Sequence, residues 1–433
     1  MSDAAAFSQS LAEQAPDGPL LLALSGGLDS SLLLYLLIKA GLGPRLSAVH
    51  VDHQLQAASQ GWSRFCQTLA DEQGIELVIE QVAVDSADGL EAGARDARYG
   101  ALLPLARAKG ATLVMAHHRN DQAETVLFRL LRGAGVQGLS AMGEHSNQQD
   151  VPLWRPLLGL SRESLEHWGA ALSLRWREDP SNQDQSLRRN YLRHTILPAL
   201  RDRWPGADAT LARAADHMAE AGELLHEIAV QDADKLGVAG ASFPLTDLAD
   251  LSLARQRNVL RWWLQQNRAT APSAAVLEQM RGLHLAAGDS QARVEWGGYA
   301  VRLYQGALYL ALRDTFQPWQ GDAFWPEGTP PPALPHWHWT QQATEGAVWV
   351  LRPPGDLQLR PLSGSRSLLR NGLHQQIKEL WRAAGVPPWQ RRQWPLLFRH
   401  GEVVSVPLIG VADGEEPGHS ERWYLLPGDS MAH

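Results

Sequence analysis

Residues 22–31 read Leu-Ala-Leu-Ser-Gly-Gly-Leu-Asp-Ser-Ser, and this stretch decides the expected fold of the N-terminal part of the chain. It joins the end of an apolar run to a turn with two glycines and then to an apolar helical pattern. Gly26 and Gly27 let the backbone fold tightly and direct several N–H groups at one point, where the following helix adds the positive end of its dipole. The stretch therefore predicts an anion-binding loop between a strand and a helix.

Strand-like and helical patterns alternate on both sides of this loop. Apolar runs at residues 20–24, 45–51, 75–82 and 112–116 are separated by helical patterns at 30–40, 62–73 and 89–109. This alternation predicts an α/β fold with a doubly wound, mostly parallel sheet. Ligands of such sheets bind at the carboxyl ends of the strands. We therefore expect the chemistry just after Leu24, Val51 and Met115.

The loop differs from a Walker loop, because no lysine follows its glycines and Asp29 takes part instead. An acid beside phosphates needs a bridging Mg²⁺ or partners that tolerate its charge. The pattern Ser-Gly-Gly-x-Asp-Ser resembles the pyrophosphate loop of the N-type ATP pyrophosphatases, the PP-loop superfamily, which split ATP between its α and β phosphates. The resemblance implies ATP and Mg²⁺ as cofactors, with ATP held by Ser25, Gly26, Gly27, Leu28, Asp29, Ser30 and Ser31.

Two histidine-containing clusters fall at predicted strand ends, at residues 50–55 (His50, Val51, Asp52, His53, Gln54 and Leu55) and at residues 116–125. Histidine and aspartate are common ligands of Zn²⁺ and Mn²⁺, so a metal-dependent phosphoesterase is one interpretation. Such an enzyme does not need the phosphate loop. If the loop instead binds ATP, as the resemblance implies, Asp52 contacts the ribose or adenine of ATP, and His117 is a further nucleotide contact.

Four more charged residues are candidates for catalysis. Asp121 and Glu124 lie three positions apart, so both face one side of a helix, where they could bind Mg²⁺ or take a proton from an amine. Asp29 and Asp121 are the candidate Mg²⁺ ligands. Arg95 and Arg98, also three apart, can neutralise phosphate charge as it develops. Surface salt bridging is the alternative role for these two arginines.

Cysteine content and charge exclude some classes of protein and favour others. The single cysteine, Cys66, excludes an internal disulfide, a cysteine-only zinc cluster and a persulfide relay between two thiols. The formal net charge is -8, yet residues 357–400 contain eight basic residues and the single acid Glu379. This segment favours a polyanionic partner, although an ordinary basic surface is the simpler alternative.

The length of 433 residues predicts two or three domains of roughly 100 to 200 residues each. We expect a catalytic domain at 1–206, a mainly helical middle domain at 207–315, a proline-rich linker at 316–346 and a small α+β domain at 347–433, with a helix near 373–384. No apolar run reaches the roughly 20 residues of a membrane span. The N-terminus lacks the pattern of a secretory signal, so a cytoplasmic protein is expected.

The stretch 117–142 is more specific than the loop. It contains Asp-Gln-Ala-Glu-Thr, then Arg129-Leu-Leu-Arg132-Gly133-Ala-Gly135 and Gly138-Leu-Ser-Ala-Met142. Together with 155–158, 178–182, 189–193, 260–264, 386–392 and 394–396, it resembles the tRNA(Ile)-lysidine synthetases over about residues 20–410. Asn120 departs from the family pattern, where a second acid is expected.

This resemblance implies a two-step reaction on the wobble cytidine of an isoleucine tRNA with anticodon CAU. ATP adenylates the C2 carbonyl oxygen, and free lysine then displaces AMP to leave lysidine. The implied tRNA contacts are Arg129, Arg132, Arg188, Arg189, Asn190 and Arg193 at the anticodon stem-loop, with Trp389, Arg391 and Arg392 at an acceptor stem or other helix end. A homodimer is one assembly that the sequence leaves open. Another PP-loop ligase, acting on a different RNA base or a small molecule, and a tRNA-binding module without catalysis are the alternatives.

Overall fold

The computed structural model describes residues 2–52, 59–83, 90–179, 184–283, 292–313, 321–334, 337–344, 347–415 and 417–427. The chain forms two compact units, Met1–Leu224 and Leu225–His433. Some predicted features lie outside the described residues, namely His53, Gln54 and Leu55, residues 180–182, and parts of the predicted linker.

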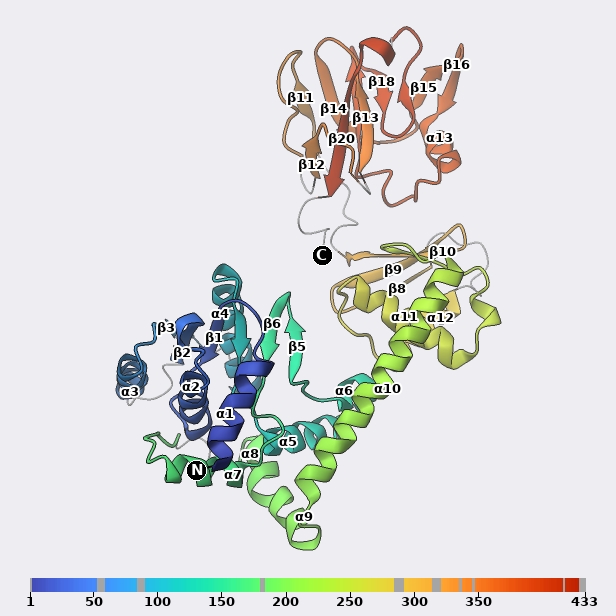
Figure 1. Cartoon of the computed structure of the whole chain (residues 1–433). Helices are drawn as coiled ribbons and strands as arrows, with labels where there is room; N and C mark the ends of the chain where they lie inside the picture. Colours follow the sequence, from blue (N-terminus) through green and yellow to red (C-terminus); the bar gives the residue numbers. More distant parts are fainter. Residues whose placement is uncertain are drawn as a thin grey trace. The chain divides into compact units, whose positions relative to one another are not determined.

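A six-stranded sheet in the order β3-β2-β1-β4-β6-β5 forms the centre of the first unit (Figure 1). All neighbouring strands are parallel except β5, which pairs antiparallel with β6. The strands are β1 (Leu20–Ala23), β2 (Leu46–Asp52), β3 (Leu77–Gln81), β4 (Thr112–Val114), β5 (His145–Gln148) and β6 (Val151–Trp154). The expected doubly wound, mostly parallel α/β fold is therefore confirmed.

The two faces of this sheet are buried by different helices. Leu20 and Leu22 of β1 pack in one core with Leu32, whereas Leu21 between them packs in a second core with Leu102 and Leu103. Alternate side chains of a strand point to opposite faces, so β1 is buried on both sides. The helices of this unit are α1 (Ser2–Gln14), α2 (Leu28–Lys39), α3 (Ser59–Glu72), α4 (Leu90–Ala108), α5 (Arg119–Leu130), α6 (Val136–Leu139), α7 (Arg162–Ala171), α8 (Arg188–Tyr191) and α9 (Leu197–Arg203).

Helix α10 (Ala207–Leu236) begins in the first unit and ends in the second. In the second unit, α11 (Leu253–Gln266) and α12 (Ala274–Gly282) pack with a sheet in the order β7-β10-β9-β8. Its strands are β7 (Ser242–Pro244), β8 (Arg293–Trp296), β9 (Tyr299–Tyr304) and β10 (Ala307–Leu312). The indole of Trp263 is buried against Phe243 in this core, with ring centroids 5.3 Å apart.

The C-terminal part of the second unit is mainly antiparallel sheet. The sheet orders are β11-β14-β17-β18-β19, β12-β20-β13 and β15-β16. The elements are β11 (Ala323–Trp325), β12 (Trp337–Thr340), β13 (Val348–Arg352), β14 (Leu357–Pro361), β15 (Ser367–Arg370), β16 (Leu373–Gln376), α13 (Ile377–Ala383), β17 (Pro395–Arg399), β18 (Glu402–Val406), β19 (Gly410–Val411) and β20 (Glu421–Pro427). The helix expected from residue 373 thus begins at Ile377, because the preceding four residues pair with β15.

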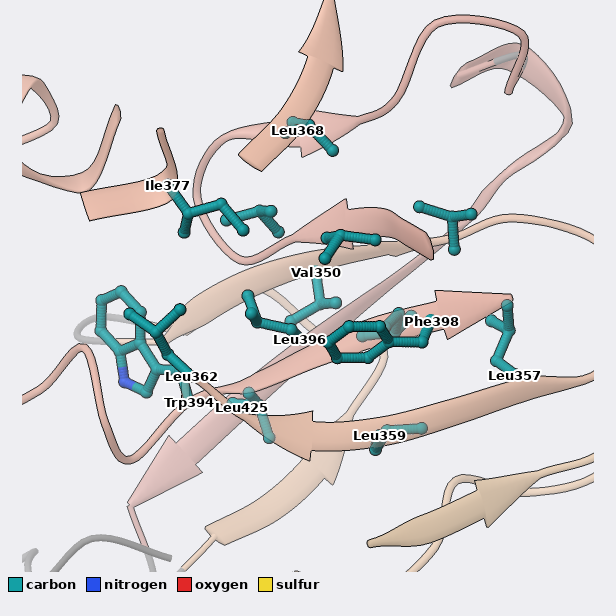
Figure 2. Packing of buried hydrophobic residues seen from close by; sticks show 14 of the residues in the cluster. Val350, Leu357, Leu359, Leu362, Leu368, Ile377, Trp394, Leu396, Phe398 and Leu425 are labelled. Atoms are coloured by element: carbon teal, nitrogen blue, oxygen red, sulfur yellow. The ribbon is translucent and has the colours of Figure 1, made fainter. Parts of the chain in front are cut away.

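Apolar side chains from several of these strands meet in one C-terminal core. Figure 2 shows Val350, Leu359, Leu396 and Phe398 gathered between the strands of this core. Trp325, Trp381 and Trp394 are buried in the same core, so these tryptophans are packing residues. In the described part of the chain, no helix is both long and apolar enough to cross a membrane.

Candidate active site

The loop after β1 is held by hydrogen bonds to its carbonyl groups. His50 Nδ1 lies 2.9 Å from the Leu24 carbonyl oxygen, and Trp62 Nε1 donates to the Ser25 carbonyl at 2.5 Å. The Gly26 carbonyl accepts from the Arg177 amide at 2.9 Å. The Gly27 carbonyl accepts from the Ser31 amide and from the Ser30 hydroxyl. Each of the four successive carbonyl groups therefore accepts a hydrogen bond from another group of the protein.

The N–H groups of the same four peptides face the opposite way. In a trans peptide the C=O and the next N–H are antiparallel, so the amides of residues 25–28 point away from the groups that bind the carbonyls. Gly27 is the N-cap of α2 and has no side chain to cover the first turn. The loop thus presents backbone amides together with the positive end of α2, as an anion site requires, and the Gly27 amide also donates to Ser25 Oγ at 3.4 Å.

Glycine is required at position 26 for two reasons. Its φ of +77° lies in the left-handed region, which side chains disfavour. A Cβ added there would lie 2.8 Å from Trp62 Nε1 and 2.9 Å from Cys66 Sγ. Helix α3 therefore packs directly beneath the turn of the loop.

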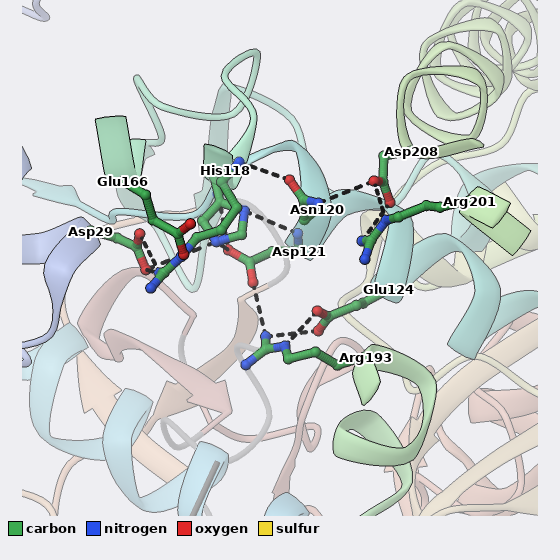
Figure 3. A network of polar contacts seen from close by, with 10 residues as sticks. Asp29, His118, Asn120, Asp121, Glu124, Glu166, Arg193, Arg201 and Asp208 are labelled. Atoms are coloured by element: carbon green, nitrogen blue, oxygen red, sulfur yellow. Dashed lines mark hydrogen bonds and ion pairs between the residues drawn. The ribbon is translucent and has the colours of Figure 1, made fainter. Parts of the chain in front are cut away.

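The acid of the loop, Asp29, pairs with an arginine far away in the sequence. Arg162 Nη1 donates to both carboxylate oxygens of Asp29, at 2.7 and 2.8 Å (Figure 3). His118 Nε2 lies 3.9 Å from Asp29 Oδ2 and 3.5 Å from Asp121 Oδ2. Burial raises the pKa of Asp29, and His118 and Arg162 oppose this shift. A cation beside Asp29 therefore favours its charged form.

Asp121 and Glu124 lie together in the first turns of α5, as their spacing predicts. Asp121 accepts from the His118 backbone N–H at 3.0 Å, which closes a capping box at the start of the helix. Arg193 donates to both oxygens of Glu124, at 2.6 and 2.9 Å, and to Asp121 Oδ1 at 3.2 Å. Burial raises the pKa of Glu124, whereas that of Asp121 is lowered because His118, His117 and Arg193 outweigh its burial. Arg193 is thus hydrogen-bonded to both acids of this pair.

Five arginines form a cluster close to these acids, which we call the arginine cluster: Arg95, Arg98, Arg129, Arg155 and Arg189. Burial lowers the pKa of Arg98, and the positive charges of Arg95 and Arg189 lower it further. Burial and the charges of Arg95, Arg189 and Arg155 likewise lower the pKa of Arg129. Among the described residues, the buried Nε atoms of Arg98 and Arg155 have no hydrogen-bond partner. The arginine cluster is therefore a positively charged site suited to a polyanion.

Two predicted nucleotide contacts lie at the end of β2 and after β4, and one of them, His117, lies beside the arginine cluster. Asp52 is the buried last residue of β2, and its Oδ2 accepts from the Ser63 hydroxyl at 3.2 Å. Burial lowers the pKa of His117 to about 3, so its imidazole is neutral at physiological pH. Arg155, Arg98 and Arg95 add positive charge beside that ring.

The predicted tRNA contacts occupy different surroundings. Arg132 and Arg188 are exposed. Asn190 is buried, and its side-chain amide donates a hydrogen bond to the Asp184 carbonyl at 2.9 Å. Arg129 Nη1 donates to the carbonyls of Gly138 and Ala141, so it also holds the segment after α5.

In the second unit, Trp389 is buried, and its indole packs edge-on against the rings of Tyr304 and Tyr309, which also contact each other. Arg391 donates to the Val386 carbonyl and to the Tyr304 hydroxyl, whereas Arg392 is exposed. Of these three residues, Arg392 is the one whose charge faces solvent.

The acids of the first unit do not form a metal cage by themselves. Among the residues that the structure describes, no group of three His, Cys, Asp or Glu side chains could hold a metal ion. The oxygens of Asp29 and Asp121 accept hydrogen bonds from Arg162, Arg193 and the His118 amide. Mg²⁺ bound chiefly through nucleotide phosphates needs only one or two carboxylates, so these residues fit a cation that arrives with ATP.

Sequence reasoning missed three residues that hold the site, namely Trp62, Arg162 and Arg177. Each of them reaches the loop from 35 or more positions away, for example Trp62 from 37 and Arg162 from 133. No local pattern marks such contacts. Arg155 could have been found, because it begins an Arg-Pro-Leu-Leu stretch that belongs to the resemblance described above.

A glycine loop that presents its amides at the carboxyl edge of a parallel sheet defines the class of nucleotide-binding PP-loop domains. The model of the PP-loop domain family matches residues 2–200. Two further family models match, the TilS substrate binding domain at residues 243–309 and the TilS substrate C-terminal domain at residues 356–426.

Curated relatives agree along almost the whole chain. A tRNA(Ile)-lysidine synthase of Pseudomonas syringae pv. tomato is 38% identical over 93% of this chain and 90% of its own length. One from Salmonella typhimurium is 36% identical over 94% of this chain and 96% of its own length. The chain therefore belongs to the tRNA(Ile)-lysidine synthase family. It is an ATP-using PP-loop ligase of tRNA processing, with tRNA as its partner.

Among solved structures, the U34-tRNA thiolase NcsA from Methanococcus maripaludis is 17% identical, with a TM-score of 0.43. The match covers 51% of this chain and 78% of that one.

Replacing Trp62 with Phe tests how the loop is held. The change keeps an aromatic ring but removes the N–H that donates to the Ser25 carbonyl, so the amides of the loop lose their fixed direction. We expect the KM for ATP to rise about tenfold, because an unsatisfied carbonyl costs on the order of 1–3 kcal/mol. The exposed Trp204→Phe exchange is the matched control and should leave the KM unchanged. An unaltered KM in Trp62→Phe would contradict the role of the indole.

Cys66 provides a test of whether sulfur takes part in the chemistry. Burial raises the pKa of its thiol to about 12, so the thiol stays protonated at neutral pH and is a poor nucleophile. We expect the Cys66→Ala variant to keep its ATP-dependent activity with a modest loss of thermal stability. Native protein should also resist iodoacetamide until it is unfolded. Loss of activity in a variant that melts near the wild-type temperature would show that the thiol is needed.

Proposed function

We propose that the chain joins free lysine to C2 of the wobble cytidine of an isoleucine tRNA with anticodon CAU. In the first step the C2 carbonyl oxygen attacks the α-phosphate of ATP, and pyrophosphate leaves. In the second step the ε-amine of lysine bonds to C2, the bond from C2 to the AMP oxygen breaks, and lysidine remains. The observation that carries this proposal is the proximity of Asp121 to both Asp29 of the loop and Arg98 of the arginine cluster.

The first step uses the loop and the arginines. Residues 25–31 bind the phosphates of ATP through backbone amides and serine hydroxyls. Arg95 and Arg98 neutralise the charge that develops on the α-phosphate and on the leaving pyrophosphate. Asp52 and His117 contact the nucleoside part of ATP. Asp29 and Asp121 would hold Mg²⁺, which supplies further neutralisation of the phosphates when it is bound.

The second step needs a neutral amine and a group that takes its proton. Burial raises the pKa of Glu124, which is the direction that favours accepting a proton from the lysine ammonium. Arg193 holds the Glu124 carboxylate in place through two hydrogen bonds. Asp121 beside it keeps its charge, because its pKa is lowered, and attracts the ammonium group. The acid pair thus supplies both attraction and proton transfer.

Phosphate contacts position the tRNA, and the target base is recognised after it leaves the stack. Arg129 and Arg189 of the arginine cluster, with the exposed Arg132 and Arg188, suit the anticodon stem-loop. Arg392 supplies charge for a second contact in the C-terminal part. Cytoplasmic location and a homodimer stay predictions.

Two other functions make different predictions. A PP-loop ligase for another RNA base or a small molecule would consume ATP without attaching lysine to tRNA. A phosphoesterase would need a metal cluster, and the described residues provide none, although His53 lies outside them. The ligase proposal is therefore the one that the geometry supports best.

Incorporation of labelled lysine tests the reaction directly. The protein is incubated with ATP, Mg²⁺, radiolabelled lysine and the CAU-anticodon isoleucine tRNA, with initiator methionine tRNA as the control substrate. We expect acid-precipitable label in the isoleucine tRNA alone, with one AMP formed for each lysine attached. ATP cleavage without label in either tRNA would keep the PP-loop chemistry and remove lysine and this tRNA from the proposal.

Arg392→Ala tests the C-terminal contact. Loss of one exposed phosphate contact should weaken tRNA binding at physiological salt and reduce the slope of log K against log salt concentration by about 1. Filter binding at several salt concentrations measures both quantities. The KM for ATP is the internal control and should not change. An unaltered affinity and slope would exclude Arg392 from the tRNA interface.

A further inference from the structure

Arg162 is the charge partner of the phosphate loop, and its position is tightly fixed. It is the first residue of α7, and its Nη1 binds both oxygens of Asp29. Its Nε donates to Glu166 Oε1 at 2.9 Å, one turn later on the same helix. An arginine held between two acids has one preferred orientation. Asp29 is therefore paired with Arg162 in the free protein, and its oxygens keep further lone pairs for the Mg²⁺ that would arrive with ATP.

Asn120 fixes the backbone from which Arg162 projects. Its side-chain Oδ1 accepts from the Arg162 backbone N–H at 2.9 Å, and its Nδ2 donates to Asp208 Oδ2 at 3.1 Å. The first amides of a helix lack partners within the helix, so Asn120 satisfies one that α7 leaves open. Arg201 also donates to both oxygens of Asp208. Figure 3 shows Asn120 facing Asp208, and Asp208 facing Arg201.

The amide at position 120 is matched to the acid at position 208. An amide can accept from Arg162 and donate to Asp208 at the same time, whereas a carboxylate can only accept. An aspartate at 120 would place two carboxylates within hydrogen-bonding distance, and their repulsion would push α5 and α10 apart at this point. Asn120, where the resemblance led us to expect an acid, thus has a structural reason in this chain.

We propose that Asn120 is a positioning residue for ATP binding, which acts through Arg162 and is matched to Asp208. It holds the start of α7 so that the guanidinium stays on Asp29 and the loop can receive phosphates. The same amide ties the start of α7 to the first turn of α10. This inference rests on the proposed function only in assigning the loop to ATP, and it does not depend on the lysine or tRNA step.

The test compares Asn120→Asp, Asp208→Asn and the double variant that exchanges amide and acid. Asn147→Asp is the matched control, because it makes the same chemical change at an exposed position on β5. Titration calorimetry with α,β-methylene-ATP and Mg²⁺ gives affinity without turnover, and scanning calorimetry gives stability. We expect Asn120→Asp to weaken binding about tenfold and the double variant to recover part of this loss, because Arg201 keeps only one acceptor on an asparagine at position 208. Asn147→Asp should match wild type.

Each other outcome contradicts the inference. Unchanged affinity in Asn120→Asp removes Asn120 from the positioning of the loop. A lower melting temperature with unchanged affinity assigns it a structural role only. A double variant no better than Asn120→Asp excludes the match with Asp208. Wild-type protein that binds the nucleotide with this pattern, yet attaches no lysine to tRNA, would contradict the proposed reaction and leave this inference standing.

Discussion

The first unit depends on the hydrogen bonds that engage the carbonyls of Leu24, Ser25, Gly26 and Gly27. Because each peptide is trans, binding a carbonyl on one side fixes an amide on the other. The donors come from β2, from α3 and from the segment after α7, so three separate parts of the chain must fold before the loop has its shape. The glycine at position 26 then follows from packing, since α3 leaves no room for a Cβ there.

Charge is arranged around this loop in a definite order. Asp29 is paired with Arg162, the acid pair on α5 is paired with Arg193, and the arginine cluster lies beside them with its charges close to one another. The paired groups bind one another, whereas in the arginine cluster Arg129 and Arg155 donate to backbone carbonyls between residues 138 and 143. Among the described residues, the buried Nε atoms of Arg98 and Arg155 have no hydrogen-bond partner. This distribution of charge supports the proposal that the nucleotide and the RNA are bound close together at one edge of the sheet.

The sequence predicted those parts of the structure that follow local rules. The strands β1, β2 and β4 follow from apolar runs, and so does the helix after the glycine turn, which was expected at 30–40 and begins two residues earlier, at Leu28. The hairpin of β5 and β6 was not predicted, because His145–Gln148 is a polar edge strand and Pro152 interrupts the next one. The sequence did not predict the roles of Arg162, Trp62 and Asn120 either. Their roles arise from tertiary contacts that no spacing encodes.

The arginine cluster has a further consequence, for the lifetime of the protein. Its mutual repulsion opposes folding in the free chain, Asp121 offsets part of it at Arg98, and an anion among the guanidinium groups would relieve it further. Whatever binds the folded form alone raises its stability by mass action. Copies that carry nucleic acid should then open less often and present fewer sites to proteases than idle copies. The rate at which this protein is degraded would thereby depend on the supply of its own substrate.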